Sequence, residues 1–224
     1  MSMAKNMVKH MQVLNKAALA GASKRSKTDY ARDVIKGKDW ELHLADCVEL
    51  AKEQLDESID YSIYSPPFAS LYTYSNIDRD MGNCADDVEF MIHYSLLVAE
   101  LFRTTKPGRL TSFHCVNYPS MKARDGVIGL KDFRGELIRT HIAAGWIYHS
   151  EVCIWKDPVT SMQRTKALGL LHKQLKKDSS MSRMGIPDYV VTMRKPGENK
   201  ERVTHTPDDF PVSEWQQIAS PVWM

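Results

Sequence analysis

Asp60-Tyr-Ser-Ile-Tyr-Ser-Pro-Pro-Phe68 is the segment of this 224-residue chain that decides the fold. Its residues 61–64 are predicted to form a strand. The two prolines that follow end this strand, because proline has no N–H to donate to a sheet. Ser65 and Phe68 therefore stand at the carboxyl end of a predicted strand, which is the edge where open α/β sheets bind their ligands.

Strands and helices alternate on both sides of this segment. The predicted strands are 41–45, 61–64, 110–116, 146–155 and 189–193, and the predicted helices are 48–55, 86–103 and 133–142. From residue 41 to about 155 this order is typical of a mostly parallel α/β sheet. It also predicts that Asp46 and Ser65 lie at the carboxyl ends of adjacent strands.

Composition restricts the class of protein. Hydrophobic residues make up 43% of the chain and charged residues 26%, as in an ordinary globular domain. No apolar run is long enough for a membrane span, and the first residues lack a secretory signal. The four cysteines form no Cys-x-x-Cys pair, so we expect no metal site and a reduced, cytoplasmic setting. Residues 1–40 are interpreted as a basic extension, helical around 8–20, and residues 41–224 as the main domain.

Basic residues are concentrated in one segment, although the net charge is only +2. Residues 163–183 contain a single acid, Asp178, and the following basic side chains: Arg164, Lys166, His172, Lys173, Lys176, Lys177 and Arg183. The segment around 160–185 is therefore a candidate for holding the phosphate backbone of a nucleic acid. A solvated helix face is the alternative interpretation.

The Ser-Pro-Pro-Phe turn suits a specific reaction. An amine on a nucleobase is a poor nucleophile because its lone pair is delocalised into the ring. Two acceptors aimed at its two hydrogens, Ser65 Oγ and the Pro66 carbonyl, would favour a pyramidal nitrogen. Pro67 helps to fix the backbone of the turn, and Phe68 can stack on a base turned out of the duplex.

Ser65-Pro66-Pro67-Phe68 resembles the catalytic motif of the N4-cytosine and N6-adenine DNA methyltransferases. Leu44-Ala-Asp-Cys47 resembles the strand-end acid that precedes this motif, and weaker similarities extend over residues 106–108, 153–156, 187–196 and 215–224. The resemblance covers about residues 40–224 and is closest to phage and bacterial members whose catalytic motif comes first. It implies a Rossmann-like methyltransferase sheet, double-stranded DNA as substrate, and the cytoplasm of a bacterial or phage-infected cell.

The same resemblance implies S-adenosylmethionine as the methyl donor. Asp46 would accept a hydrogen bond from the adenine amine of this cofactor, and Cys47 would supply a backbone N–H to the adenine ring. The serine before the prolines favours N4-cytosine as the target, with N6-adenine left open. C5-cytosine methylation is disfavoured, because it needs a nucleophilic cysteine, usually after proline, and no Pro-Cys pair occurs.

One departure from the family pattern concerns the loop that binds the methionine part of the cofactor. The family uses Phe-x-Gly-x-Gly, and none of the eleven glycines here forms a Gly-x-Gly. We therefore expect an incomplete sheet, with the missing half supplied by further C-terminal sequence or by a second polypeptide. A homodimer is also possible. The alternative function is a non-catalytic DNA-binding module or subunit that lacks the cofactor loop.

Further candidates lie outside the motif. Trp155, at the end of a predicted strand, is a candidate for stacking on the flipped base, or else a core residue. Tyr72 and Tyr74 follow the catalytic turn and are candidates for lining the DNA channel. His141 lies on an apolar helix face and is expected to be structural, as is Asp60.

Overall fold

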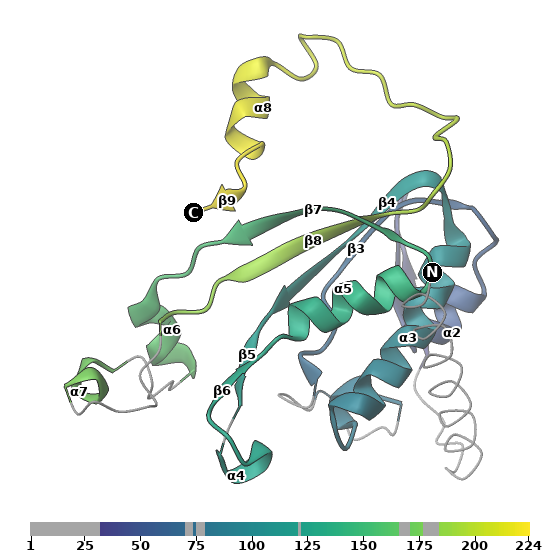
Figure 1. Ribbon diagram of the computed structural model, residues 1–224. Helices are drawn as coiled ribbons and strands as arrows, with labels where there is room; N and C mark the ends of the chain where they lie inside the picture. Colours follow the sequence, from purple (N-terminus) through teal and green to yellow (C-terminus); the bar gives the residue numbers. More distant parts are fainter. Residues whose placement is uncertain (1–31, 70–73, 75–78, 121, 166–170, 177–183) are drawn as a thin grey trace, which may run out of the picture.

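The structure is a computed structural model that describes residues 32–69, 74, 79–120, 122–165, 171–176 and 184–224. Among these residues, the main sheet has five strands in the order β3-β4-β8-β7-β9 (Figure 1). These strands are β3 (Ile59–Tyr64), β4 (Thr105–Val116), β8 (Asp188–Arg194), β7 (Ile147–Ile154) and β9 (Val222–Trp223). The predicted strands over 61–64, 110–116, 146–155 and 189–193 are confirmed within a few residues.

The sheet is mixed, because β8 runs opposite to the other four strands. The prediction of a mostly parallel sheet is confirmed for β3, β4 and β7, the strands between residues 41 and 155 that join it. β3 pairs with β4 in parallel and β7 with β9 in parallel, whereas β8 runs antiparallel to both β4 and β7. β8 differs because it starts at the edge where β7 ends, so the chain runs back along β7. As a result, the carboxyl ends of β3, β4 and β7 meet the amino end of β8 at one edge, and this edge carries the candidate site.

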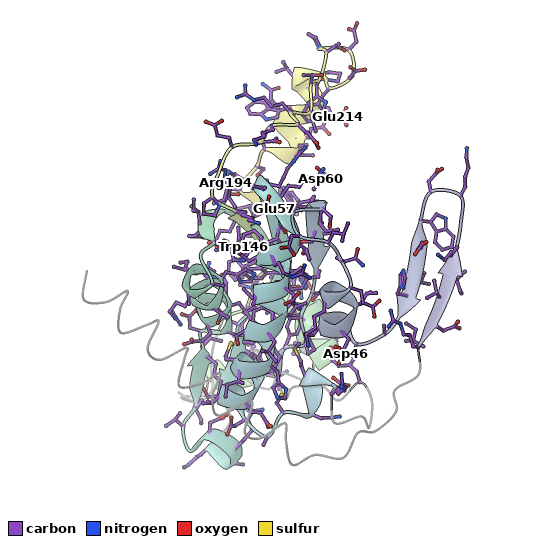
Figure 2. All side chains as sticks on the ribbon, turned by 90° about the vertical axis from the view of Figure 1, so that its right-hand side faces the viewer. Asp46, Glu57, Asp60, Trp146, Arg194 and Glu214 are labelled. Atoms are coloured by element: carbon purple, nitrogen blue, oxygen red, sulfur yellow. The ribbon has the colours of Figure 1, made fainter. Side chains whose placement is uncertain are left out.

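The strand before Asp46 does not join the main sheet. β2 (Glu41–Leu44) pairs antiparallel with β1 (Asp33–Lys36), and a hydrogen bond of 2.8 Å from Gly37 N–H to Trp40 O closes the turn between them. This hairpin stands apart from the sheet, beyond the labelled Asp46 (Figure 2). The prediction that Asp46 and Ser65 end adjacent strands is therefore wrong, because β2 forms its hydrogen bonds with its neighbour in sequence instead of with β3.

The three predicted helices are confirmed, as α2 (Cys47–Lys52), α3 (Asp87–Thr104) and α5 (Phe133–Ala143). The carboxylates of Asp86 and Asp132 accept hydrogen bonds from backbone N–H groups in the first turns of α3 and α5. The remaining short elements are η2 (Met81–Asn83), β5 (Tyr118–Ser120), α4 (Lys122–Asp125), β6 (Gly129–Lys131), α6 (Pro158–Thr165), α7 (His172–Leu175) and α8 (Val212–Ile218). No helix among the described residues is long and apolar enough to cross a membrane. β1 lies inside the expected 1–40 extension, whose predicted helix around 8–20 is outside the described residues.

One face of the sheet is covered by α3 and α5. Phe113 on β4 and Val191 on β8 are fully buried on this face, together with Phe90 on α3 and Leu137 on α5. Alternate residues of a strand point to opposite faces, so the neighbours of Phe113 and Val191 in sequence lie on the other face. That second face carries the polar side chains described in the next subsection.

A hydrogen-bond network inside the core ties β3 to both helices. His141 Nδ1 lies 2.8 Å from the Leu137 carbonyl, which can only accept, so this nitrogen carries the proton and Nε2 is an acceptor. Tyr64 OH, 3.1 Å away, donates to Nε2, and Tyr94 OH donates to Tyr64 over 2.8 Å. Burial lowers the pKa of His141 to about 4, so the ring is neutral at pH 7. The expectation that His141 is structural is confirmed.

This network predicts a loss of stability in mild acid. The folded chain holds His141 at a pKa of about 4, against 6.5 for an ordinary histidine, so the unfolded chain binds the proton first as the pH falls. The free energy of unfolding should therefore decrease from pH 6.5 down to about 4, by about 3 kcal/mol in total. Urea denaturation across this pH range should show a smaller decrease for His141→Phe. The exposed His205 supplies the control variant, His205→Gln, which should keep the wild-type slope. An equal slope in His141→Phe would contradict the assignment.

Candidate functional site

The Ser-Pro-Pro-Phe turn leaves β3 at the edge where four strands meet. Tyr64 faces the core and Ser65, the next residue, is exposed, as strand alternation requires. Pro66 is buried, which holds the turn in place behind the serine. None of the described residues donates a hydrogen bond to the Pro66 carbonyl. The turn thus presents a hydroxyl and a carbonyl oxygen from a backbone that two prolines restrain.

Phe68 is half-buried under the turn. Its ring centre lies 5.9 Å from the His114 ring and 6.3 Å from Phe133, and Phe68 packs against the hydrophobic core. Ala69, which follows, has a φ of 48°, a left-handed conformation that costs energy for a residue with a Cβ. Core packing therefore fixes one side of the Phe68 ring. Part of the ring stays exposed, and its stacking on a base remains a prediction.

A chain of polar contacts runs from Ser65 across the sheet. Ser65 Oγ lies 3.2 Å from His114 Nδ1 on β4 and 3.4 Å from the His114 carbonyl. His114 Nε2 lies 2.9 Å from Asp188 Oδ2 at the start of β8, and Lys156 Nζ, just after β7, lies 2.5 Å from the same oxygen. Four residues, on or just after four different strands, thus form one connected line along the edge.

Asp188 anchors this line and is only 5% exposed. Burial raises the pKa of its carboxyl, but the hydrogen bonds from His114 and Lys156 outweigh burial, and the net shift is downward. The carboxylate is therefore ionised at neutral pH. The contacts among His114, Asp188 and Lys156 were not predicted from the sequence, because these residues are far apart along the chain. Each of them lies at or near the end of a predicted strand. That they meet depends on the order of the strands in the sheet, which the sequence does not give.

Asp46 caps a helix. Its Oδ1 accepts hydrogen bonds from the backbone N–H groups of Val48, at 2.9 Å, and Glu49, at 3.1 Å, which makes it the N-cap of α2. Its Oδ2 lies 3.3 Å from Arg79, and the side chain is 15% exposed. The N–H of Cys47 makes no hydrogen bond with another described residue. Val48 packs against the core that also receives Tyr64, so side-chain packing joins the start of α2 to the sheet.

Trp155 is described by the structure, whereas the basic segment is described only in part. Trp155 directly follows β7, is 54% exposed and lies at the same edge as Ser65. Lys173 belongs to α7, and Lys176 is exposed at the end of this helix. Tyr72, Lys177 and Arg183 lie outside the described residues. The ranges that the structure describes contain no group of three or more His, Cys, Asp or Glu side chains suited to a metal ion.

Asp60 is paired with two cations at the opposite end of the strands. Lys106 Nζ lies 3.1 Å from its carboxylate and Arg109 lies 3.2 Å away, in agreement with a structural role for Asp60. A shallow hollow of about 270 Å³ lies here, lined by Asp60, Tyr61, Gly108, Arg109, Leu110 and Asn199. It is separated from the Ser-Pro-Pro turn by the length of β3 and is not part of the candidate site.

Comparison of the fold found similar solved structures. TTHA0409 from Thermus thermophilus, which its name assigns as a DNA modification methylase, superposes with a TM-score of 0.57 at 13% identity, over 80% of this chain and 63% of its own. The complex of TTHA0409 with S-adenosyl-L-methionine superposes with a TM-score of 0.57 at 14% identity, over 80% of this chain and 66% of its own. The cytosine-N4-specific PvuII DNA methyltransferase superposes with a lower TM-score of 0.47 at 18% identity, over 70% of this chain and 50% of its own.

These comparisons establish the fold. The chain has the mixed α/β fold of TTHA0409, which confirms the expected α/β sheet, and it spans about two thirds of the length of that protein. No protein-family model matches the sequence. No curated protein matches it significantly either.

The capping role of Asp46 predicts a specific pattern of stability. Asp46→Ala removes the acceptor of two N–H groups and should lower the free energy of unfolding by about 1 kcal/mol. Asp46→Asn should keep most of this stability, because asparagine caps helices nearly as well as aspartate. Chemical denaturation measures both values. Equal losses for the two variants would show that the ion pair with Arg79, and not the cap, is the stabilising contact.

Proposed function

We propose that this chain carries the catalytic part of an S-adenosylmethionine-dependent DNA methyltransferase that methylates the exocyclic amine of a flipped base. The observation that carries the proposal is the Ser-Pro-Pro turn at the carboxyl edge of the sheet. There the Ser65 hydroxyl is exposed and the Pro66 carbonyl receives no hydrogen bond from the described residues. Two acceptors are thus available for the two hydrogens of an amine.

The chain offers a fit for one end of the cofactor. Asp46 keeps lone pairs beyond those used by the cap, and the Cys47 N–H makes no hydrogen bond with another described residue. Both groups suit the adenine end, as the resemblance implies, and the solved complex of TTHA0409 with S-adenosyl-L-methionine supports this cofactor. When bound, the cofactor supplies an electrophilic methyl group. The chain has no Gly-x-Gly segment for the methionine end, and we propose that further sequence or a second polypeptide supplies it.

The edge strand β3 suits such an addition. Among the described residues β3 pairs only with β4, and on the face away from α3 and α5 its residues Tyr61 and Ile63 are 51% and 67% exposed. Interior strands of α/β sheets are normally covered on both faces. We propose that the segment or polypeptide that binds the methionine end adds to this edge of the sheet.

The residues of the turn would act on the nitrogen in a direct transfer without a covalent enzyme intermediate. Ser65 Oγ and the Pro66 carbonyl accept the two N–H groups and favour a pyramidal nitrogen with its lone pair free. Phe68 and Trp155 would stack on the flipped base. Because serine precedes the two prolines, we favour N4-cytosine over N6-adenine as the target. Mass spectrometry of nucleosides from methylated DNA distinguishes the two products.

Substitutions in the turn should slow methyl transfer without weakening DNA binding. Ser65→Ala removes an acceptor that acts on the transferring nitrogen, so in the complete enzyme the single-turnover methylation of duplex DNA should slow by about a hundredfold. Ser65→Thr is the matched control, since it keeps the hydroxyl and should retain more activity than alanine. The affinity for DNA should stay within twofold of wild type for both variants.

The alternative function, a non-catalytic DNA-binding module, gives a different result. That protein would bind duplex DNA but would show no affinity for S-adenosylmethionine by calorimetry and no methylation. Asp46→Asn keeps the helix cap and should weaken cofactor binding without unfolding the chain. Methylation that is unchanged in Ser65→Ala would refute the catalytic assignment.

The basic segment should bind phosphate without reading sequence. Lysine is a point charge that suits phosphate better than base edges, so Lys173, Lys176 and Lys177 are proposed as backbone contacts. In the triple Lys→Gln variant, the slope of log affinity against log salt should fall by about 0.9 for each lost contact, equally on specific and random duplexes. An unchanged slope in filter binding over a salt series would indicate a solvated helix face.

A further inference from the structure

We propose that His114 is a positioning residue for Ser65. Its Nδ1 atom accepts the hydrogen bond that the Ser65 hydroxyl donates, and it takes the proton of that hydroxyl during methyl transfer. This inference rests on the proposed function for its catalytic meaning. The contacts that carry it are Ser65 Oγ to His114 Nδ1 at 3.2 Å and His114 Nε2 to Asp188 Oδ2 at 2.9 Å.

The direction of each hydrogen bond follows from the acceptor at the end of the line. An ionised carboxylate can only accept, so the Nε2 atom that contacts Asp188 must carry a hydrogen. In a neutral imidazole the other nitrogen, Nδ1, is then unprotonated and accepts. Lys156, at 2.5 Å from the same carboxylate oxygen, favours the ionised form of Asp188. The tautomer of His114 is therefore set by contacts on β8 and after β7.

This tautomer decides what the serine can do. The only hydrogen of the Ser65 hydroxyl is directed to His114, either to Nδ1 at 3.2 Å or to the carbonyl at 3.4 Å. Both acceptors lie on the β4 side of the turn. The lone pairs of Ser65 Oγ remain for a substrate amine on the exposed side. The shorter contact to Nδ1 adds a base that can receive the hydroxyl proton.

The proton balance of amine methylation needs such a base. When the C–S bond breaks and the N–C bond forms, the nitrogen becomes positive and must lose one hydrogen. Ser65 Oγ takes this proton while its own proton moves to His114 Nδ1, so the serine ends neutral. The imidazolium that forms lies against the Asp188 carboxylate, the arrangement that stabilises a protonated histidine in Ser-His-Asp sites. The proton then passes to solvent.

The surroundings of His114 favour this role over that of a solvated histidine. The Phe68 ring lies 5.9 Å from the imidazole and belongs to the same turn as Ser65. Asp188 is nearly fully buried, and its Oδ1 makes no hydrogen bond with the described residues, so the charged contacts of the carboxylate are concentrated on Oδ2. His114 is thereby fixed on two sides and has little freedom to turn its ring.

The first test detects the protonation of each His114 nitrogen directly and does not depend on activity. Long-range ¹H–¹⁵N spectra of the ¹⁵N-labelled chain identify the protonated nitrogen of each histidine, and His114→Gln assigns the His114 signals. We expect hydrogen on Nε2 and none on Nδ1. Ser65→Ala should shift the Nδ1 resonance of His114, and Asp188→Ala should broaden or remove the Nε2–H signal. Hydrogen on Nδ1, or an Nδ1 resonance unchanged in Ser65→Ala, would overturn the proposal.

The chain contains a matched control. His149 Nδ1 also contacts a serine, Ser150 Oγ at 2.9 Å, but no carboxylate contact of this ring is found among the described residues. Its signals should not respond to Asp188→Ala. Because Ser65 is exposed, Ser65→Ala should fold normally, which keeps the test decisive if Asp188→Ala does not fold.

Kinetic measurements then test whether these hydrogen bonds contribute to catalysis. His114→Asn can accept from Ser65 but cannot take its proton, so kcat should fall by about a hundredfold with little change in KM for DNA. Added imidazole should restore part of the activity of His114→Ala, whereas His149→Asn should behave as wild type. No rescue and an unchanged kcat in His114→Asn would refute the proton transfer. If the spectra are as expected but methylation is unchanged in Ser65→Ala, the proposed function is refuted, whereas the hydrogen bonds from Ser65 through His114 to Asp188 are confirmed.

Discussion

The Tyr64 hydroxyl is the contact on which the geometry of the candidate site depends. It donates to His141 on α5 and accepts from Tyr94 on α3, inside a core that excludes water. A buried hydroxyl without partners costs about 1–3 kcal/mol, so the end of β3 is confined to the position where both hydrogen bonds form. Ser65 is the next residue and cannot move independently, because Pro66 is buried behind it. The packing of two helices thus fixes the position of an exposed hydroxyl.

Much of the fold and the turn itself could be predicted from the sequence. The apolar periods of the helices and the strand before Pro66 are local signals, and each predicted element within the described residues formed within a few residues of its expected bounds. Strand pairing depends on distant segments. β8 lies between β4 and β7 although it is last of the three in sequence, and no local pattern specifies its antiparallel direction. The line from Ser65 to Lys156 depends on that order and was therefore not predictable.

The segment around Asp46 shows a different limit. The alternating pattern of residues 41–44 correctly indicated a strand but not its partner, and the nearest competitor, residues 33–36, required only a tight turn at Gly37. A short connection closes with a smaller loss of chain entropy than a long one. Asp46 nevertheless remains at a strand-to-helix junction, where a carboxylate both caps α2 and contacts Arg79. A capping role and a ligand-binding role are compatible, because a carboxylate has more lone pairs than the cap uses.

Two consecutive residues of β3 and its turn contact two histidines on opposite faces of the sheet, and the different partners of those histidines explain their different roles. His141 donates to the neutral carbonyl of Leu137 in the core, and burial keeps its ring uncharged. His114 instead contacts a carboxylate at the edge, next to an exposed serine. A neutral carbonyl orients an imidazole but does little to stabilise its positive charge, whereas a carboxylate does both. Strand alternation therefore separates a rigid, neutral support beneath the sheet from a site above it where a proton can be received.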